Sequence, residues 1–233
     1  MTHNSFGTLY IVSTPIGNLK DITFRAVEIL SSVSMIAAED TRHSNKLLQH
    51  YDISTPSISF FEHNRSARIP QIMNYLKKGD HVALISDAGT PGISDPAYKL
   101  IREAIAEEIT IESIPGPTAL IAAIVSSGLP TDRFIFEGFL PPKKGRKKRL
   151  MSLVNQDATI IFYESPYRLI KTLEEINEII GNRPAVIARE LTKMNEEIIR
   201  GTVSEILSYF TNKKPRGEFV IMIGKNDSNV FFK

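Results

Sequence analysis

The stretch His81–Pro96 constrains the fold most, because it joins a strand, a glycine-rich loop and a helix start. It opens with the apolar run Val82–Ile85, which predicts a strand buried on both faces. The loop D-A-G-T-P-G follows, and Ser94 or Asp95 is a good N-cap for a helix beginning near Pro96. In open α/β sheets such loops lie at the carboxyl ends of strands, where ligands bind. A tight turn without a ligand is the alternative, but three similar loops elsewhere in the chain favour a ligand site.

Strands and helices alternate through the first half of the chain. Besides Val82–Ile85, strands are predicted at Thr8–Ser13, Met35–Ala38, Ser57–Phe61 and Ile109–Ile114. The alternation predicts a largely parallel sheet. In the second half, strands are predicted at Arg133–Gly138, Ala158–Tyr163, Ala185–Arg189, Glu197–Gly201 and Phe219–Ile223. Several of these are joined by short turns, which predicts a mixed sheet. The pattern changes near Gly128–Thr131, and we place the domain boundary near Pro115–Thr118, so we expect two α/β domains, residues 1–116 and 117–233.

Composition narrows the classes of function. The chain has 233 residues, a net charge of +2 and no cysteine, which excludes disulfides and thiolate metal sites. We find no apolar run of membrane-spanning length and no signal-peptide pattern, so we expect a cytoplasmic protein. The motifs of P-loop hydrolases, dinucleotide-binding Rossmann domains and zinc hydrolases are missing from the sequence. We therefore expect no metal.

Charged residues follow the predicted strand Met35–Ala38 directly. The motif A-E-D-T-R brings Glu39, Asp40 and Arg42 to the strand's end, and polar groups at that edge are typical of a ligand site. An ion-paired helix start capped by Asp40 is the alternative. His63 could act as a base, but a lone histidine near a strand end is more often polar surface.

A dense basic block, K-K-G-R-K-K-R, occupies Lys143–Arg149. A solvated loop and helix start is one interpretation. Because cations at a helix N-terminus are electrostatically unfavourable, their accumulation favours an anionic partner.

Seven motifs in order resemble one bacterial family, the ribosomal RNA small subunit methyltransferase I family of the tetrapyrrole methylase superfamily. They are T-P-I-G-N-L at Thr14–Leu19, A-E-D-T-R at Ala38–Arg42, S-D-A-G-T-P-G-I-S-D-P at Ser86–Pro96, P-G-P-T-A at Pro115–Ala119, F-Y-E-S-P-Y-R at Phe162–Arg168, R-E-L-T-K at Arg189–Lys193 and R-G-E-F-V at Arg216–Val220. The resemblance covers nearly the whole chain. It implies an S-adenosylmethionine-dependent 2′-O-methyltransferase acting on a cytidine in the decoding region of 16S rRNA. It also implies a class III methyltransferase fold, a cofactor cleft between two α/β domains, and a homodimer.

The same resemblance and the chemistry of S-adenosylmethionine identify candidate site residues. Glycines permit close approach, while small apolar side chains and hydroxyls form a slot. The expected cofactor-binding residues are Pro15, Asp87, Gly89, Thr90, Ile93, Thr118, Ala119, Tyr163, Leu191 and Glu218. Thr90 replaces the acidic residue of the superfamily's G-D-P loop, which leaves open what meets the methionyl group or the ribose.

A ribose 2′-hydroxyl is a poor nucleophile, so a base or a hydrogen-bond acceptor is needed. Glu39, Asp40, Glu164, Glu190 and Lys193 are the candidates, and we favour Glu39 and Lys193. The expected RNA contacts are Arg42, Arg65, Lys143, Lys144, Arg146, Lys147, Lys148, Arg149 and Arg168.

Two other functions compete with RNA methylation. A small-molecule methyltransferase of tetrapyrrole type would need few phosphate contacts, and the basic block argues against it. A non-catalytic RNA-binding assembly factor would need only the basic surface, and the glycine loops and clustered carboxylates argue against that.

Overall fold

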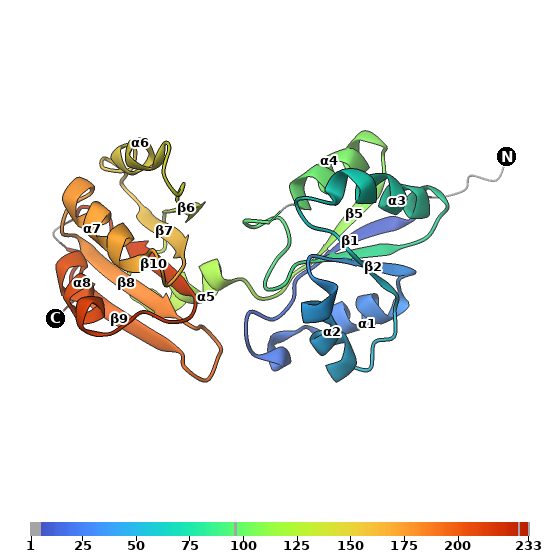
Figure 1. The fold of residues 1–233 in the computed structure, drawn as a ribbon, viewed down its shortest axis with the longest axis horizontal. Helices are drawn as coiled ribbons and strands as arrows, with labels where there is room; N and C mark the ends of the chain where they lie inside the picture. The colour runs from blue at the N-terminus through green and yellow to red at the C-terminus, as the bar shows by residue number, and fades with distance from the viewer. Residues whose placement is uncertain (1–5, 96, 228, 233) are drawn as a thin grey trace. The chain divides into compact units, whose positions relative to one another are not determined.

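The computed structural model describes residues 6–95, 97–227 and 229–232. The chain divides into two compact units, unit 1 (Met1–Thr118) and unit 2 (Ala119–Lys233). Each unit holds one five-stranded sheet, as Figure 1 shows.

The sheet of unit 1 is parallel throughout. It comprises β1 (Thr8–Val12), β2 (Met35–Ala38), β3 (Ser57–Ser59), β4 (Val82–Ile85) and β5 (Thr110–Ile114), in the order β3-β2-β4-β1-β5. The strands β2 and β4 are buried along their whole length, as expected for parallel strands covered on both faces. The predicted parallel sheet of the N-terminal half is confirmed.

Helices cover both faces of this sheet (Figure 1). They are α1 (Phe24–Ser32), α2 (Thr41–His50), α3 (Arg65–Lys77) and α4 (Ala97–Ala106), with a short 3-10 helix, η1 (Leu19–Asp21). One core contains side chains of α3 and α4, and a second contains side chains of α1 and α2. Asp95 lies just before α4, and its Oδ1 accepts a hydrogen bond of 2.9 Å from the Ala97 N–H, as a capping carboxylate does. Pro96, the other predicted part of this helix start, lies outside the described residues.

The sheet of unit 2 is mixed, as predicted. It comprises β6 (Phe134–Phe139), β7 (Thr159–Glu164), β8 (Pro184–Arg189), β9 (Glu197–Thr202) and β10 (Phe219–Ile223), in the order β6-β7-β10-β8-β9. Only the β6–β7 pair is parallel among these strands. The helices are α5 (Ala119–Ser127), α6 (Arg146–Met151), α7 (Leu169–Ile179) and α8 (Val203–Asn212). The capping box predicted at Thr202 and Glu205 starts α8.

Within the described ranges, the structure contains no helix that is both long and apolar enough to cross a membrane.

Arg146 corrects one prediction from the basic block. Its side chain is only 6% exposed, so it is not available to an RNA phosphate. Its guanidinium donates to the Thr172 hydroxyl at 2.6 Å, which in turn donates to Glu164 at 2.7 Å. Arg146 also forms ion pairs with Glu164 and with Glu175. Because buried charges need partners, Arg146 belongs to the interior, where it ties α6 to β7 and α7.

Replacing Arg146 with alanine should therefore destabilise the fold. We expect Arg146→Ala to lower the free energy of unfolding by about 3 kcal/mol, because the buried Glu164 carboxylate loses a cation. Lys147→Ala, at the exposed next position, should change it by less than about 0.5 kcal/mol. Urea unfolding monitored by circular dichroism measures both values. Equally small effects would contradict the interior role of Arg146.

Candidate functional site

The loops that follow β1, β4 and β5 are joined at one edge of the unit 1 sheet. Parallel strands deliver their carboxyl ends to the same edge. Thr14 and Gly89 exchange two backbone hydrogen bonds, of 2.9 and 3.0 Å, and the Thr14 hydroxyl donates to the Ser86 carbonyl. Gly89 has a φ of +80°, which favours glycine. The first and fourth strands thus hold their loops together through the backbone itself.

The loop after β5 is linked to the same place through hydroxyl groups. Thr90 donates to the Pro117 carbonyl at 3.2 Å, and its oxygen lies 2.9 Å from the Ser13 hydroxyl. Since a hydroxyl carries one proton, Thr90 must accept from Ser13. A Cβ at Gly116 would come within 2.8 Å of the Ser13 Cβ, so only glycine permits this approach. A carboxylate in place of Thr90 could not donate to Pro117, which gives a physical reason for threonine here.

Glu39 and Asp87 connect the loops after β2 and β4. The Asp87 carboxylate accepts from the Asp40 N–H at 2.9 Å, and the Glu39 carboxylate accepts from the Asp87 N–H at 3.3 Å. Burial raises the pKa of Glu39, and the nearby charges of Asp87 and Asp95 raise it further, against the lowering effect of the Asp87 N–H. Burial also raises the pKa of Asp95. Glu39 and Asp95 are therefore the two carboxylates whose pKa values are raised here, and Glu39 is the one of them that the sequence predicts as a general base.

Asp40 has a different role from Glu39. It is the N-cap of α2 and accepts from both the backbone N–H and the guanidinium of Arg42, at 2.7 to 3.1 Å. Those hydrogen bonds hold the pKa of Asp40 well below its usual range. Such a carboxylate is a poor proton acceptor. The contacts of Asp40 match the alternative interpretation of this motif, an ion-paired helix start.

In unit 2, a charged cluster contains Glu190 and Lys193, which follow β8, and Glu218, which directly precedes β10. The Lys193 ammonium donates to Glu190 and to Glu218, both at 3.0 Å, and Glu190 also accepts from the Glu218 N–H at 2.9 Å. Burial acts to lower the pKa of Lys193, but the two carboxylates raise it overall. Burial acts to raise the pKa of Glu190, yet its hydrogen bonds and the Lys193 charge lower it. Lys193 is therefore an ammonium at neutral pH and can act as a donor, not as a base.

The backbone of this cluster is strained. Glu190 and Thr192 have φ values of +50° and +65°, and Leu191 between them is buried. Left-handed conformations in non-glycine residues concentrate at functional sites, so the strain supports a role for this turn.

The predicted cofactor residues Ala119 and Tyr163 lie together in unit 2. Ala119 begins α5, and the Tyr163 hydroxyl accepts from the Leu120 N–H at 3.0 Å. The Tyr163 ring packs edge-on against Phe136 and Phe139, at centroid distances of 4.8 and 5.7 Å. Tyr163 thus fixes the start of α5. Of the remaining cofactor candidates, Pro15 is buried beside Thr14, Thr118 follows Pro117, and Ile93 is 39% exposed.

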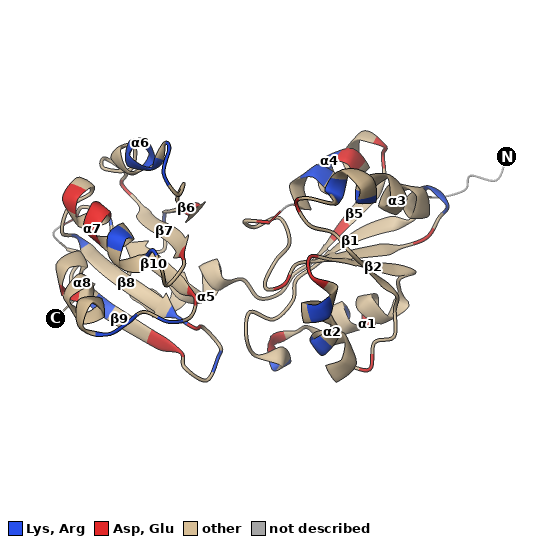
Figure 2. Ribbon diagram, viewed as in Figure 1, with Lys and Arg blue, Asp and Glu red and all other residues tan. Residues whose placement is uncertain are grey.

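The predicted RNA-contacting cations differ in availability. Lys143, Lys144, Lys147 and Lys148 are exposed on α6 and the loop before it (Figure 2). Arg42 is 90% exposed although it pairs with Asp40. By contrast, Arg65 pairs with Glu62, and Arg168 donates to the Leu140 carbonyl and pairs with Glu164. The lysines and Arg42 are therefore the best placed to meet phosphate groups.

Two contributors to these sites were not predicted from the sequence. Ser13 directly follows β1, and this position at the end of a strand was the signal in the sequence that could have identified it. Asp95 was predicted only as a cap, but it is also a carboxylate acting on Glu39. Across the residues placed by the structure, no group of three or more His, Asp or Glu side chains could hold a metal ion.

Residues 8–207 match the family of Tetrapyrrole (Corrin/Porphyrin) Methylases. Cobalt precorrin-4 methyltransferase is similar with a TM-score of 0.72 at 19% identity, covering 96% of this chain and 97% of that one. The uroporphyrin-III C-methyltransferase of Thermus thermophilus complexed with S-adenyl homocysteine gives 0.67 at 14% identity, covering 93% and 97%. Such low identities show the fold alone, and the fold is that of a tetrapyrrole methylase, as predicted.

Curated relatives named ribosomal RNA small subunit methyltransferase I are much more similar in sequence. The Synechocystis protein is 52% identical over 219 residues, which are 93% of this chain and 78% of that protein. The Thermotoga maritima protein is 51% identical over 217 residues, 93% of this chain and 98% of that protein. The chain therefore belongs to the tetrapyrrole methylase family and, within it, to the family of ribosomal RNA small subunit methyltransferase I, as the sequence motifs indicated.

The raised pKa of Glu39 predicts the pH dependence of stability. A carboxyl whose pKa is raised by folding stabilises below its ordinary pKa and loses that contribution as pH rises through the folded value. Glu39→Gln should therefore raise Tm at pH 7 and leave it unchanged near pH 4, as measured by scanning calorimetry.

Glu205 is the control with the opposite sign. Hydrogen bonds from Thr202 lower its pKa, so its contribution is present at neutral pH and is lost as pH falls. Glu205→Gln should lower Tm at pH 7 and have less effect in acid. A lower Tm for Glu39→Gln at pH 7 would show that the Glu39 charge is not destabilising.

Proposed function

We propose that this chain transfers a methyl group from S-adenosylmethionine to the 2′-hydroxyl of a cytidine in the decoding region of 16S rRNA. The observation that carries the proposal is the loop-joined edge of the unit 1 sheet, with the half-buried carboxylate of Glu39 within it. The names of the relatives, which act on small-subunit rRNA, support the substrate class.

The residues of the edge fit the cofactor in chemistry. S-adenosylmethionine supplies a methyl group on a sulfonium, and it presents an amino acid, a ribose diol and an adenine. The hydroxyls and backbone groups near Gly89, Thr90 and Thr118 can meet its polar groups, and Gly116 lets the loop after β5 lie against Ser13, where a Cβ would collide with the Ser13 side chain. We assign Pro15 and Asp87 to the same site, Asp87 holding the cradle through the Asp40 N–H.

In unit 2 we assign Ala119, Tyr163, Leu191 and Glu218 to cofactor binding, with Ile93 of unit 1 as an exposed apolar contact. Tyr163 fixes the first turn of α5, and Glu218 holds Lys193. These residues position groups around the cofactor rather than exchange protons.

As the ribose oxygen would bond to the methyl carbon, the methyl–sulfur bond would break and leave a neutral thioether, and the hydroxyl proton must pass to a base. We assign this proton to a carboxylate oxygen of Glu39, whose raised pKa brings it nearer to neutral pH. The Lys193 ammonium, held by Glu190 and Glu218, is assigned to an anionic group of the substrate. Asp40 and Glu190 then act as positioning residues for Arg42 and Lys193.

We assign RNA binding to the exposed cations Arg42, Lys143, Lys144, Lys147, Lys148 and Arg149. Arg65 and Arg168 contribute only those N–H donors that are not used in their ion pairs within the protein. Binding through phosphates makes affinity fall with salt. The predicted homodimer and cytoplasmic location remain predictions; sedimentation of the purified chain tests the former.

Gly89 provides a test of cofactor binding by itself. Gly89→Ala places a side chain where φ is positive, which costs about 1–2 kcal/mol. The loop should shift to relieve this strain, and the affinity for S-adenosylmethionine, measured by calorimetry, should then fall about tenfold. Gly181 also has a positive φ, and a Cβ there meets nothing within 4 Å. Gly181→Ala should therefore cost similar stability and leave cofactor affinity unchanged. Equal affinities in both variants would place the cofactor elsewhere.

Single-turnover methylation of small ribosomal subunits tests the function and the assigned roles. Glu39→Gln and Lys193→Met should each slow methyl transfer by about 10²–10⁴-fold at saturating RNA, with near-normal cofactor affinity. The double variant should lose less than the product of the two, since both act on one transition state. No transfer by the wild-type chain would refute the function, and full rates in both variants would refute the roles.

A further inference from the structure

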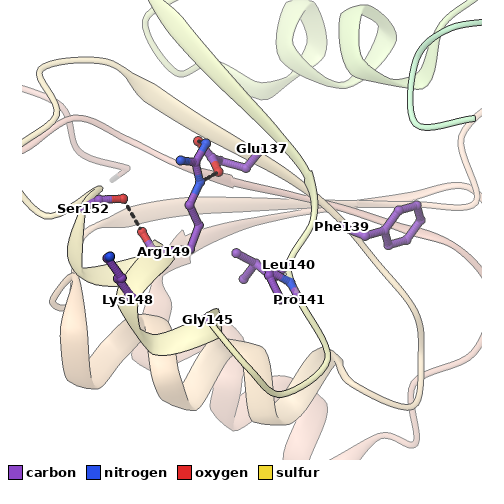
Figure 3. Close-up of a pocket in the computed structure, with 8 residues that line it drawn as sticks. All are labelled: Glu137, Phe139, Leu140, Pro141, Gly145, Lys148, Arg149 and Ser152. Atoms are coloured by element: carbon purple, nitrogen blue, oxygen red, sulfur yellow. Dashed lines mark hydrogen bonds and ion pairs between the residues drawn. The ribbon is translucent and has the colours of Figure 1, made fainter. Parts of the chain in front are cut away.

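Unit 2 contains a cavity of about 540 Å³ between the end of β6 and α6. This volume is typical of small-ligand sites. Its lining residues, drawn in Figure 3, are Glu137, Phe139, Leu140, Pro141, Gly145, Lys148, Arg149 and Ser152. None of the cofactor or catalytic residues assigned above lines it, but Phe139 packs against Tyr163, and Lys148 and Arg149 are among the cations assigned to RNA.

A buried carboxylate forms one wall of this cavity. The Glu137 side chain is only 3% exposed, and it lies where the β6–β7 register shifts between Phe136 and Gly138. Such bulges redirect side chains. Both oxygens of Glu137 accept from Arg149, through Nε and through Nη2 at 2.9 Å. Glu137 thus fixes the guanidinium, as Figure 3 shows.

This ion pair leaves binding capacity in the cavity. A guanidinium has five N–H donors, and the pair with Glu137 uses only part of them; the Arg149 side chain is 54% exposed. Lys148 is exposed as well. The lining of the cavity therefore includes two cations and one carboxylate. Pro141 supplies a partly exposed apolar surface beside them, whereas the Leu140 side chain belongs to the buried core (Figure 3).

We propose that this cavity binds one nucleotide of the RNA substrate. Arg149 and Lys148 contact its phosphate, through the Nη hydrogens that the pair with Glu137 leaves and through the lysine ammonium. The nucleoside lies over Pro141 and the exposed guanidinium plane of Arg149, because unstacked bases in RNA complexes stack on aromatic rings or guanidinium planes. The inference rests on the proposed function. It assigns a specific contact to the two cations that line the pocket and none to the solvated lysines around them.

Lys147 and Lys148 are a matched pair for testing this. Both are exposed neighbours on α6, but only Lys148 lines the cavity. Lys148→Ala should weaken binding of small subunits about tenfold, as expected for a hydrogen bond to a charged group. Lys147→Ala should weaken it less than about threefold. Equal losses would mean a diffuse basic surface and would overturn the pocket.

Filling the cavity tests it without removing a charge. Ser152→Trp should weaken RNA binding by a similar factor, whereas Ser208→Trp, at an exposed position of α8, should not. Circular dichroism establishes that both variants fold. Unchanged RNA affinity in a folded Ser152→Trp variant would contradict the proposal.

Cytidine 5′-monophosphate probes the site directly. Its titration, followed by NMR, should shift amide signals of residues 137–152 in the wild-type chain and not in Ser152→Trp. Identical shifts with inorganic phosphate alone would indicate an anion site only and overturn nucleotide binding. This titration needs neither cofactor nor methyl transfer. A chain that binds the nucleotide but methylates no RNA would therefore refute the proposed function and leave nucleotide binding standing.

Discussion

The two backbone hydrogen bonds between Thr14 and Gly89 are the constraint on which the rest of the unit 1 edge depends. They join the loops of two strands that are neighbours in the sheet, β1 and β4. With Gly89 fixed, Thr90 reaches both Ser13 and Pro117, and the loop after β5 joins the edge. The site is therefore built from main chain and small side chains, which suits a ligand that must be approached closely.

Charge is distributed unevenly over the candidate groups, and that distribution separates their roles. Asp40 and Glu190 are held as carboxylates by cations, and Lys193 is held as an ammonium. Compared with Asp40, Glu190 and Lys193, only Glu39 has a pKa displaced toward neutrality, because burial outweighs its hydrogen bond. An ionised carboxylate in such surroundings is unfavourable for folding, which is the usual situation of a group retained for chemistry.

Much of the fold could be predicted because local signals agree with the tertiary structure. Apolar runs such as Val82–Ile85 became buried parallel strands, and the Thr202 capping box began a helix. Contacts between distant segments could not be predicted. In the sequence, Arg146 is one more cation of a basic block, yet in the structure it is buried and contacts Thr172 and Glu164. Glu137 gave no signal, because its burial follows from a bulge in the strand pairing. Hydrophobic periodicity indicates on which face of a helix or strand a residue lies, but it does not indicate which distant residue its side chain contacts.

The central claim is that this edge serves methyl transfer to a ribose hydroxyl of small-subunit rRNA. The most direct measurement offers the wild-type chain radiolabelled S-adenosylmethionine with three acceptors: small ribosomal subunits from cells lacking this chain, naked 16S rRNA and a tetrapyrrole precursor. Labelled RNA is then digested to nucleosides and analysed by mass spectrometry. The account predicts 2′-O-methylcytidine from rRNA and no label in the tetrapyrrole. A methylated base, or label in the tetrapyrrole alone, would contradict it.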